Sequence, residues 1–163
     1  MTKLLLGLAI IAFTTFVGYL LTKKYRKRKI FFTQFYDFNH RFLNEIAYFK
    51  RPVGEFISKY TYKGEFDELL KKYTKNISTP FFMENLLKTD DFSFLTSDEK
   101  RIVIDYFLTL GKGNTTTQTA YYNGVKESLN SLKIQSEKEN KRYGDLFIKL
   151  GFLCGLFILI LII

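Results

Sequence analysis

Few residues of this chain carry side chains that could catalyse a reaction, and they do not form a recognisable set. His40 is the only histidine and lies beside Arg41. This position is typical of a solvated or capping residue rather than of a general base. A metal site needs clustered histidine, cysteine or carboxylate ligands. The nearest approach is four acidic residues within 90–99, and acidic residues before a helix usually just favour its dipole.

Phosphate and thiol chemistry have equally little support. Gly111-Lys112-Gly113 is too short for a phosphate-binding loop and is not followed by Lys-Ser or Lys-Thr. Cys154 is the single cysteine, so no intramolecular disulfide can form. The eighteen Phe and eleven Tyr are best explained as core and interface residues. We therefore predict that the protein is not an enzyme and holds no metal or cofactor.

The clearest feature of the chain is an apolar segment at each end. Leu4–Leu21 contains no charged residue, and as a helix its eighteen residues span roughly 27 Å at ~1.5 Å per residue. A cleaved signal peptide is the alternative. The length, the lack of a small-x-small cleavage site and the six basic residues that follow argue against it. Residues 1–22 are predicted to be a transmembrane helix.

The C-terminal segment is shorter. Leu150–Ile163 has fourteen residues without charge, about 21 Å against a hydrocarbon core of ~30 Å. Extending it back to Leu146 gives eighteen residues but includes Lys149. A lysine near a helix end can place its ammonium group among the lipid headgroups. A buried core helix is the alternative, but the segment is apolar on every face. We predict a transmembrane helix over residues 146–163.

Basic residues predict the orientation. Segment 23–29 carries six of them, and four more lie within or just before the second span. Basic flanks stay cytoplasmic, so the central domain is predicted in the cytoplasm with both termini outside. The formal charge is +9, and such a basic run can bind anionic lipids or nucleic acid. We favour a role of this basic run in setting the topology and contacting lipid, and we predict that no nucleic acid is bound. The residues concerned are Lys23, Lys24, Arg26, Lys27, Arg28 and Lys29.

Residues 30–145 are predicted to form a helical cytoplasmic domain. Apolar residues recur at spacings of three and four, which is typical of helices with one buried face. Residues 135–145 are mostly polar and are expected to be solvated. The predicted apolar faces consist of Phe31, Phe35, Phe38, Phe42, Ile46 and Phe49; Phe56, Ile57 and Tyr60; Phe66, Leu69, Leu70 and Tyr73; Phe82, Met83, Leu86 and Leu87; Ile102, Val103, Tyr106, Phe107 and Leu110; and Tyr121, Val125, Leu129 and Leu132.

Helix boundaries are marked by breakers and caps. Pro52 ends one helix and begins the next. Thr96 to Glu99 forms a capping box, and Gly111 closes the helix that follows it. Further boundaries are expected at Lys63-Gly64, at Thr79-Pro80 and at Thr115 or Thr116. The predicted fold is all-α: a membrane-anchored helical bundle of about six helices with one transmembrane helix at each terminus.

A GxxxG pattern lies in the second apolar segment. Gly151 and Gly155 would let another helix backbone approach closely. The partner is either Thr14 and Gly18 of the first segment or another subunit, and the sequence leaves both open.

Three segments of the chain resemble segments of one protein family. Leu43 to Tyr48 with Pro52 resembles a family segment with a glutamate-isoleucine pair, an aromatic residue and a downstream proline. Leu110 to Asn114 with Gln118 resembles the family's Leu-Gly-x-Ser-Asp turn, although Gly113-Asn114 replaces Ser-Asp. Leu150 to Gly155 resembles the opening of its last membrane helix. Together with the paired terminal spans, these segments resemble the stage III sporulation protein AB family over nearly the whole chain.

The resemblance implies a non-enzymatic scaffold of a secretion-like complex in the mother-cell membrane during sporulation. Its domain would be similar to the helical domain of the platform protein of type II secretion and type IV pilus systems. It would dock a hexameric cytoplasmic ATPase, for which stage III sporulation protein AA is the family's candidate, and contact other channel subunits. We predict the exposed turn at Lys112, Asn114 and Gln118 as the contact. A platform role in another such system, or a lipid or nucleic-acid tether, is the alternative.

Overall fold

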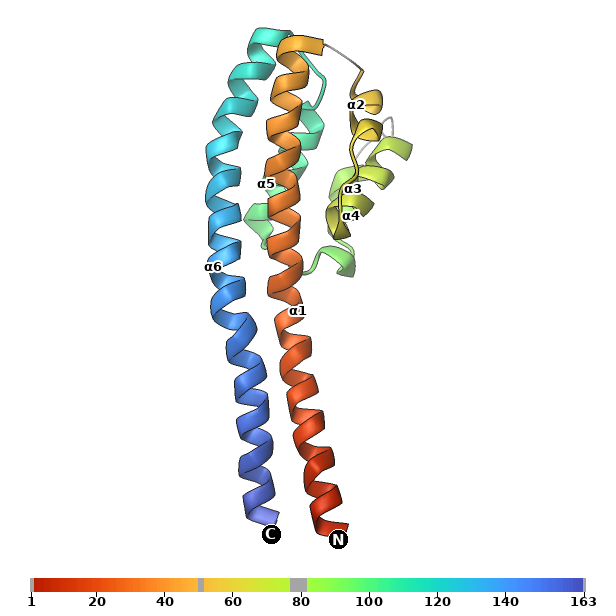
Figure 1. Ribbon diagram of the computed structural model, residues 1–163. Coiled ribbons are helices and arrows are strands. Elements are labelled where there is room, and N and C mark those ends of the chain that lie inside the picture. The colour runs from red at the N-terminus through yellow and green to blue at the C-terminus, as the bar shows by residue number, and fades with distance from the viewer. Residues whose placement is uncertain (1, 50–51, 77–81, 163) are drawn as a thin grey trace. The chain divides into compact units, whose positions relative to one another are not determined.

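The computed structural model describes residues 2–49, 52–76 and 82–162, with side chains from residue 7 to residue 161 of these ranges. The described residues contain six α-helices and no strand, so the all-α prediction is confirmed (Figure 1). The helices are α1 (Thr2–Asn44), α2 (Val53–Lys59), α3 (Gly64–Lys75), α4 (Phe82–Leu87), α5 (Ser97–Thr109) and α6 (Thr115–Ile162). A π-helical turn, Glu45–Phe49, follows α1, and a 3-10 turn, Asp90–Phe92, precedes α5.

The chain divides into two compact units. The first, which we call the helix-end unit, consists of residues 1–29 and 135–163. The second, which we call the core domain, consists of residues 30–134. Both α1 and α6 contribute residues to each unit.

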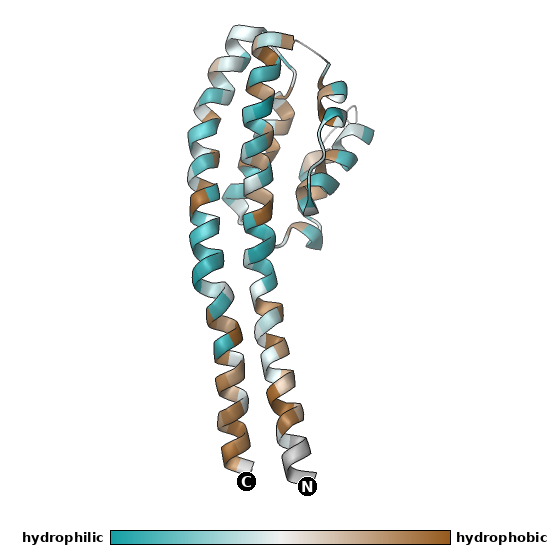
Figure 2. Cartoon of the chain, in the orientation of Figure 1, coloured by the Kyte–Doolittle hydropathy of each residue, from teal (hydrophilic) through white to brown (hydrophobic). Residues whose placement is uncertain are grey.

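Among the described residues, two helices are long and apolar enough to cross a membrane, and they are α1 and α6. Apolar residues dominate the end of α1 near the N-terminus and the end of α6 near the C-terminus (Figure 2). The core helix of a soluble protein would bury most of its apolar window. Here only 17% of the window in α1 and 6% of the window in α6 is buried. Each predicted transmembrane segment therefore belongs to a helix that could span a bilayer.

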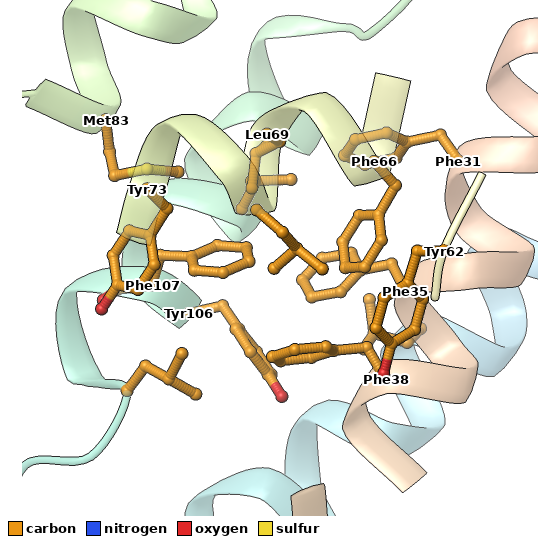
Figure 3. Packing of buried hydrophobic residues seen from close by; sticks show 14 of the residues in the cluster. Phe31, Phe35, Phe38, Tyr62, Phe66, Leu69, Tyr73, Met83, Tyr106 and Phe107 are labelled. Carbon is orange, nitrogen blue, oxygen red and sulfur yellow. The ribbon is translucent and has the colours of Figure 1, made fainter. Parts of the chain in front are cut away.

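The core domain is built around aromatic rings. Phe31, Phe35 and Phe38 of α1 are fully buried, and each contacts Phe66 of α3 with ring centroids 5.4 to 5.6 Å apart. The rings of α5 complete the cluster, where Tyr106 meets Phe35 edge to face at 4.8 Å (Figure 3). Edge-to-face pairs add to the stabilisation that ring burial provides. This cluster holds α1, α3 and α5 together.

Most predicted core residues are buried, but the prediction for Phe49 is wrong. Its side chain is 56% exposed, although spacing from Ile46 placed it on the inner face. The cause is the π-helical turn, whose wider winding rotates residue 49 away from the stripe that α-helical spacing predicts. Tyr60, also predicted in the core, is only half-buried because α2 has already ended in extended backbone at that residue.

A second difference concerns α6. Tyr122 is fully buried and Tyr121 only partly, whereas the sequence pattern favoured Tyr121. Tyr122 lies seven residues before Leu129, so it fits the helical period as well as Tyr121 does. Contact with Phe42 and Tyr106, at centroid distances of 5.0 and 4.9 Å, decides between them.

Caps explain where α5 begins. Thr96 accepts a hydrogen bond from the Glu99 amide at 3.3 Å, and the Glu99 carboxylate accepts one from the Thr96 amide at 2.8 Å. The predicted capping box is confirmed. The expected start of a helix at Thr79-Pro80 lies outside the described residues, and α4 is described from Phe82.

One polar side chain lies inside the aromatic core. Asn39 is fully buried, donates to the Tyr122 carbonyl at 3.1 Å and accepts from the Tyr106 hydroxyl at 3.0 Å. Burial raises the pKa of Tyr106 well above its usual value, so this hydroxyl remains a donor. The asparagine therefore links α1, α5 and α6 through satisfied polar groups.

Replacing Asn39 with leucine should destabilise the core domain by about 2–4 kcal/mol, because two buried polar groups lose their partner. Thermal unfolding of the full chain in micelles, followed by tyrosine fluorescence, measures the loss. Tyr106→Phe is the matched control, since it removes only one hydrogen bond and should cost less. Equal losses from the two variants would contradict the linking role of Asn39.

Candidate functional site

A groove of about 220 Å³ lies in the core domain where the end of α1, the start of α2 and the turn between α5 and α6 meet. Two segments far apart in the sequence form its walls. The first contributes Phe42, Glu45, Ile46, Pro52 and Val53, and the second contributes Gly111, Thr115 and Gln118. The groove has no deep enclosed cavity and mixes apolar with polar groups, which suits contact with another protein.

The π-helical turn shapes one side of this groove. Glu45 is buried in the wall, whereas Tyr48 and Phe49, a few residues further along the turn, are 79% and 56% exposed. The ammonium group of Lys59 lies 5.2 Å from the centre of the Phe49 ring, within the range of a cation–π contact. Single π-helical turns occur frequently at functional sites. Exposed aromatic rings next to a groove are the residues that most often anchor protein contacts.

The opposite side is a turn that glycine permits. Gly111 has a φ of 75°, and a Cβ there would lie 2.5 Å from Cγ2 of Val53. Gly113 has a φ of 89° and open space around it. Glycine adopts these left-handed conformations without strain. At Gly111 it also lets the α5–α6 turn contact the start of α2.

The three predicted contact residues have different places in this turn. Asn114 caps α6, since its Oδ1 accepts from the Thr117 amide at 2.8 Å. Gln118 donates to the Gly113 carbonyl at 3.0 Å and lines the groove. Lys112 is exposed. Asn114 and Gln118 thus hold the turn in shape; Lys112 and Asn114 are exposed, and Gln118 is half-buried.

In the helix-end unit, α1 and α6 approach closely at glycines. A Cβ at Gly151 would lie 2.5 Å from the Thr14 carbonyl oxygen, and a Cβ at Gly155 would lie 2.7 Å from Cα of Ile11. Gly18 faces Phe147 in the same way. Of the two partners that the sequence left open for the GxxxG pattern, the structure places α1 against it.

The basic segment contains one buried member, Arg28. Lys23, Lys24 and Arg26 are exposed, but only 7% of Arg28 is exposed, and its guanidinium group pairs with Glu139 at 2.5 Å. Glu139 also accepts from Gln135 at 2.9 Å. Arg28 was predicted with the lipid-facing and topology-setting residues. Its side chain instead joins α1 to α6.

No described group has the features of a catalytic centre. Burial raises the pKa of Tyr62 and of Tyr122 to about 12, so these tyrosines remain protonated rather than activated. Among the described residues, no three His, Cys, Asp or Glu side chains gather as metal ligands. The tyrosines with a raised pKa lie in the core, and desolvation is the main cause of each of their shifts. The pKa of the exposed Lys71 is raised mainly by its hydrogen bond to Asp67.

Comparison with known proteins yields one match. The family model described as stage III sporulation protein AB matches residues 3–163. No curated protein and no solved structure matches the chain.

Replacing Gly111 with alanine should destabilise the core domain by about 2–4 kcal/mol, because left-handed strain and a clash with Val53 add together. Gly113→Ala is the matched control, with the strain but no clash, and should cost about 1 kcal/mol. Thermal unfolding of both variants measures the difference. If the two variants have the same melting temperature, Gly111 is not needed for the contact with α2.

Replacing Gly155 with isoleucine should push α1 and α6 apart and cost about 1–3 kcal/mol. Gly144→Ile on the same helix is the control, because a Cβ at Gly144 meets nothing within 4 Å. The measurement is thermal unfolding of the full chain in micelles. A Gly155 variant as stable as the Gly144 variant would show that the helices do not depend on this close approach.

Proposed function

Because the chain belongs to the stage III sporulation protein AB family, we propose that it is a non-enzymatic scaffold of a secretion-like sporulation channel. Its core domain docks a cytoplasmic ATPase similar to stage III sporulation protein AA. Its helix ends anchor it in the mother-cell membrane beside other channel subunits. Family membership supports a sporulation-associated protein; the scaffold role and the ATPase are our inference.

One observation carries the docking proposal. Leu43 to Tyr48 with Pro52, and Leu110 to Asn114 with Gln118, are the two segments of the core domain that resemble the family. They are separated by more than fifty residues in the sequence, yet both contribute walls to the same groove. Tyr48 belongs to the first of these segments and Lys112 to the second, and both side chains are exposed.

The chemistry of the groove suits a protein partner better than a substrate. Tyr48 and Phe49 offer apolar contact area with few rotatable bonds, and Lys59 and Lys112 are exposed cations of the same segments. Aromatic anchors with polar groups around them are typical of interface hot spots. The positive charges favour a partner that presents acidic residues.

The membrane part of the proposal rests on the helix ends. Residues 1–22 and 146–163 would cross the bilayer, residues 23–29 would lie at the cytoplasmic surface, and residues 30–145 would be cytoplasmic. Both termini would then lie outside. Basic residues next to apolar helices support this orientation. They also support contact with anionic lipid rather than with nucleic acid.

Docking is tested by exchanging exposed residues of the two segments that contribute the groove walls. Lys112→Glu combined with Tyr48→Ala should reduce co-purification of the ATPase at least tenfold, because both side chains are exposed and a contact charge is reversed. Lys88→Glu is the control, since Lys88 is also an exposed lysine of the core domain but belongs to neither wall segment. Wild-type recovery of the ATPase with the double variant at unchanged thermal stability would remove this groove as the docking site.

A further inference from the structure

The contacts between α1 and α6 show which residue of one helix lies opposite which residue of the other. Gly7 faces Leu159, Gly18 faces Phe147, and Arg28 pairs with Glu139. The two helices are therefore antiparallel in the helix-end unit, and the numbers of facing residues there add to about 166, because both helices rise ~1.5 Å per residue.

This register gives the depth of every residue in the bilayer that the proposed function assigns to the helix ends. On α1 the charges nearest to the apolar segment are Lys3 and Lys23. They are twenty residues apart, about 30 Å along the helix, which matches the ~30 Å hydrocarbon core. On α6, Lys149 is level with Val17, so it lies about 9 Å inside the boundary that Lys23 marks.

Lys149 belongs to a charged stripe on the outer face of α6. The face toward α1 carries Glu139, Phe147 and Gly151, at intervals of eight and four residues. Lys149 follows Phe147 by two residues and so lies about 200° around the helix from it. The same argument places three more charged residues on this outer face, and all four side chains are exposed: Lys138, Arg142, Asp145 and Lys149.

The stripe runs from the headgroup level into the hydrocarbon. Lys138 lies outside the boundary, Arg142 at it and Lys149 within it, and the three cations outnumber the single acid, Asp145. A lysine at this depth lays its alkyl stem along the acyl chains and extends its ammonium group toward the phosphates. An excess of positive charge at that level is complementary to a lipid with a net negative headgroup.

We propose that the outer face of α6 binds an anionic phospholipid of the leaflet next to the core domain, with Arg142 and Lys149 contacting its phosphate. The site shares no residue with the groove of the core domain or with the face of α6 that contacts α1. It rests only on the membrane anchoring in the proposed function and is independent of ATPase docking. The stem of Lys149 contacts the first carbons of the acyl chains, and Asp145 limits the attraction by offsetting one cation.

Native mass spectrometry of the full chain, released from mixed micelles that contain phosphatidylglycerol or phosphatidylcholine, tests the site. Lys149→Leu should weaken phosphatidylglycerol binding about fivefold and leave phosphatidylcholine unchanged. Asp145→Asn should strengthen phosphatidylglycerol binding by a similar factor. Lys88→Gln, which removes an exposed cation of the core domain, should change neither. Free glycerol phosphate should not compete, because it lacks the acyl chains that the lysine stem contacts.

Three results would overturn the site: unchanged phosphatidylglycerol binding by the Lys149 variant, competition by free glycerol phosphate, or a smaller assembly of that variant in phosphatidylcholine. A smaller assembly of the Lys149 variant would mean that the stripe faces an acidic residue of another membrane helix. Alkaline extraction of vesicles distinguishes failure of the lipid site from failure of the proposed function. If wild-type chain is extracted, the membrane anchoring itself is wrong. If it stays in the vesicles without lipid preference, only the lipid site is wrong.

Discussion

The close approach of α1 and α6 at their glycines is the contact on which the helix-end unit depends. In the bilayer that we propose for the helix-end unit, burying leucine against leucine gains little over burying it against lipid. Close backbones must therefore supply the attraction, and only residues without a large side chain allow them. Gly18 and Gly155 face backbone atoms of the opposite helix. Because these approaches occur at defined points, they also fix the register, which places Arg28 next to Glu139.

The core domain solves the packing problem differently. In water, ring burial is favourable in itself, so the domain can rely on large side chains in place of glycine contacts. Phe66 alone contacts three rings of α1. Asn39 then gives this apolar cluster a specific arrangement, because its two hydrogen bonds are satisfied by α5 and α6 together. α1 and α6 therefore take part in both units, through glycines in one and through Asn39 and Tyr122 in the other.

The groove arises from how helices end. α1 changes to a π-helical turn and stops before Pro52, and α5 stops before the left-handed Gly111. These interruptions leave side chains of both segments at one place, including the exposed ring of Tyr48. Contact with another protein is the function that this arrangement supports, because the polar groups of Asn114 and Gln118 are occupied in holding the turn. This agreement between local geometry and the proposed scaffold is why the groove, rather than the buried tyrosines, is the candidate site.

Sequence by itself determined the helical class, the two apolar ends, the capping box and most of the aromatic core, because these follow from local periodicity and composition. It could not choose between Tyr121 and Tyr122, which fit the period equally, nor foresee that a π-helical turn exposes Phe49. Asn39 is polar, so nothing in the pattern marked it as a core residue. The pairing of Arg28 with Glu139, the α1 partner of Gly155 and the residue of α1 level with Lys149 were decided by tertiary structure alone. Each depends on which residue of a distant helix lies opposite, and that information is not local.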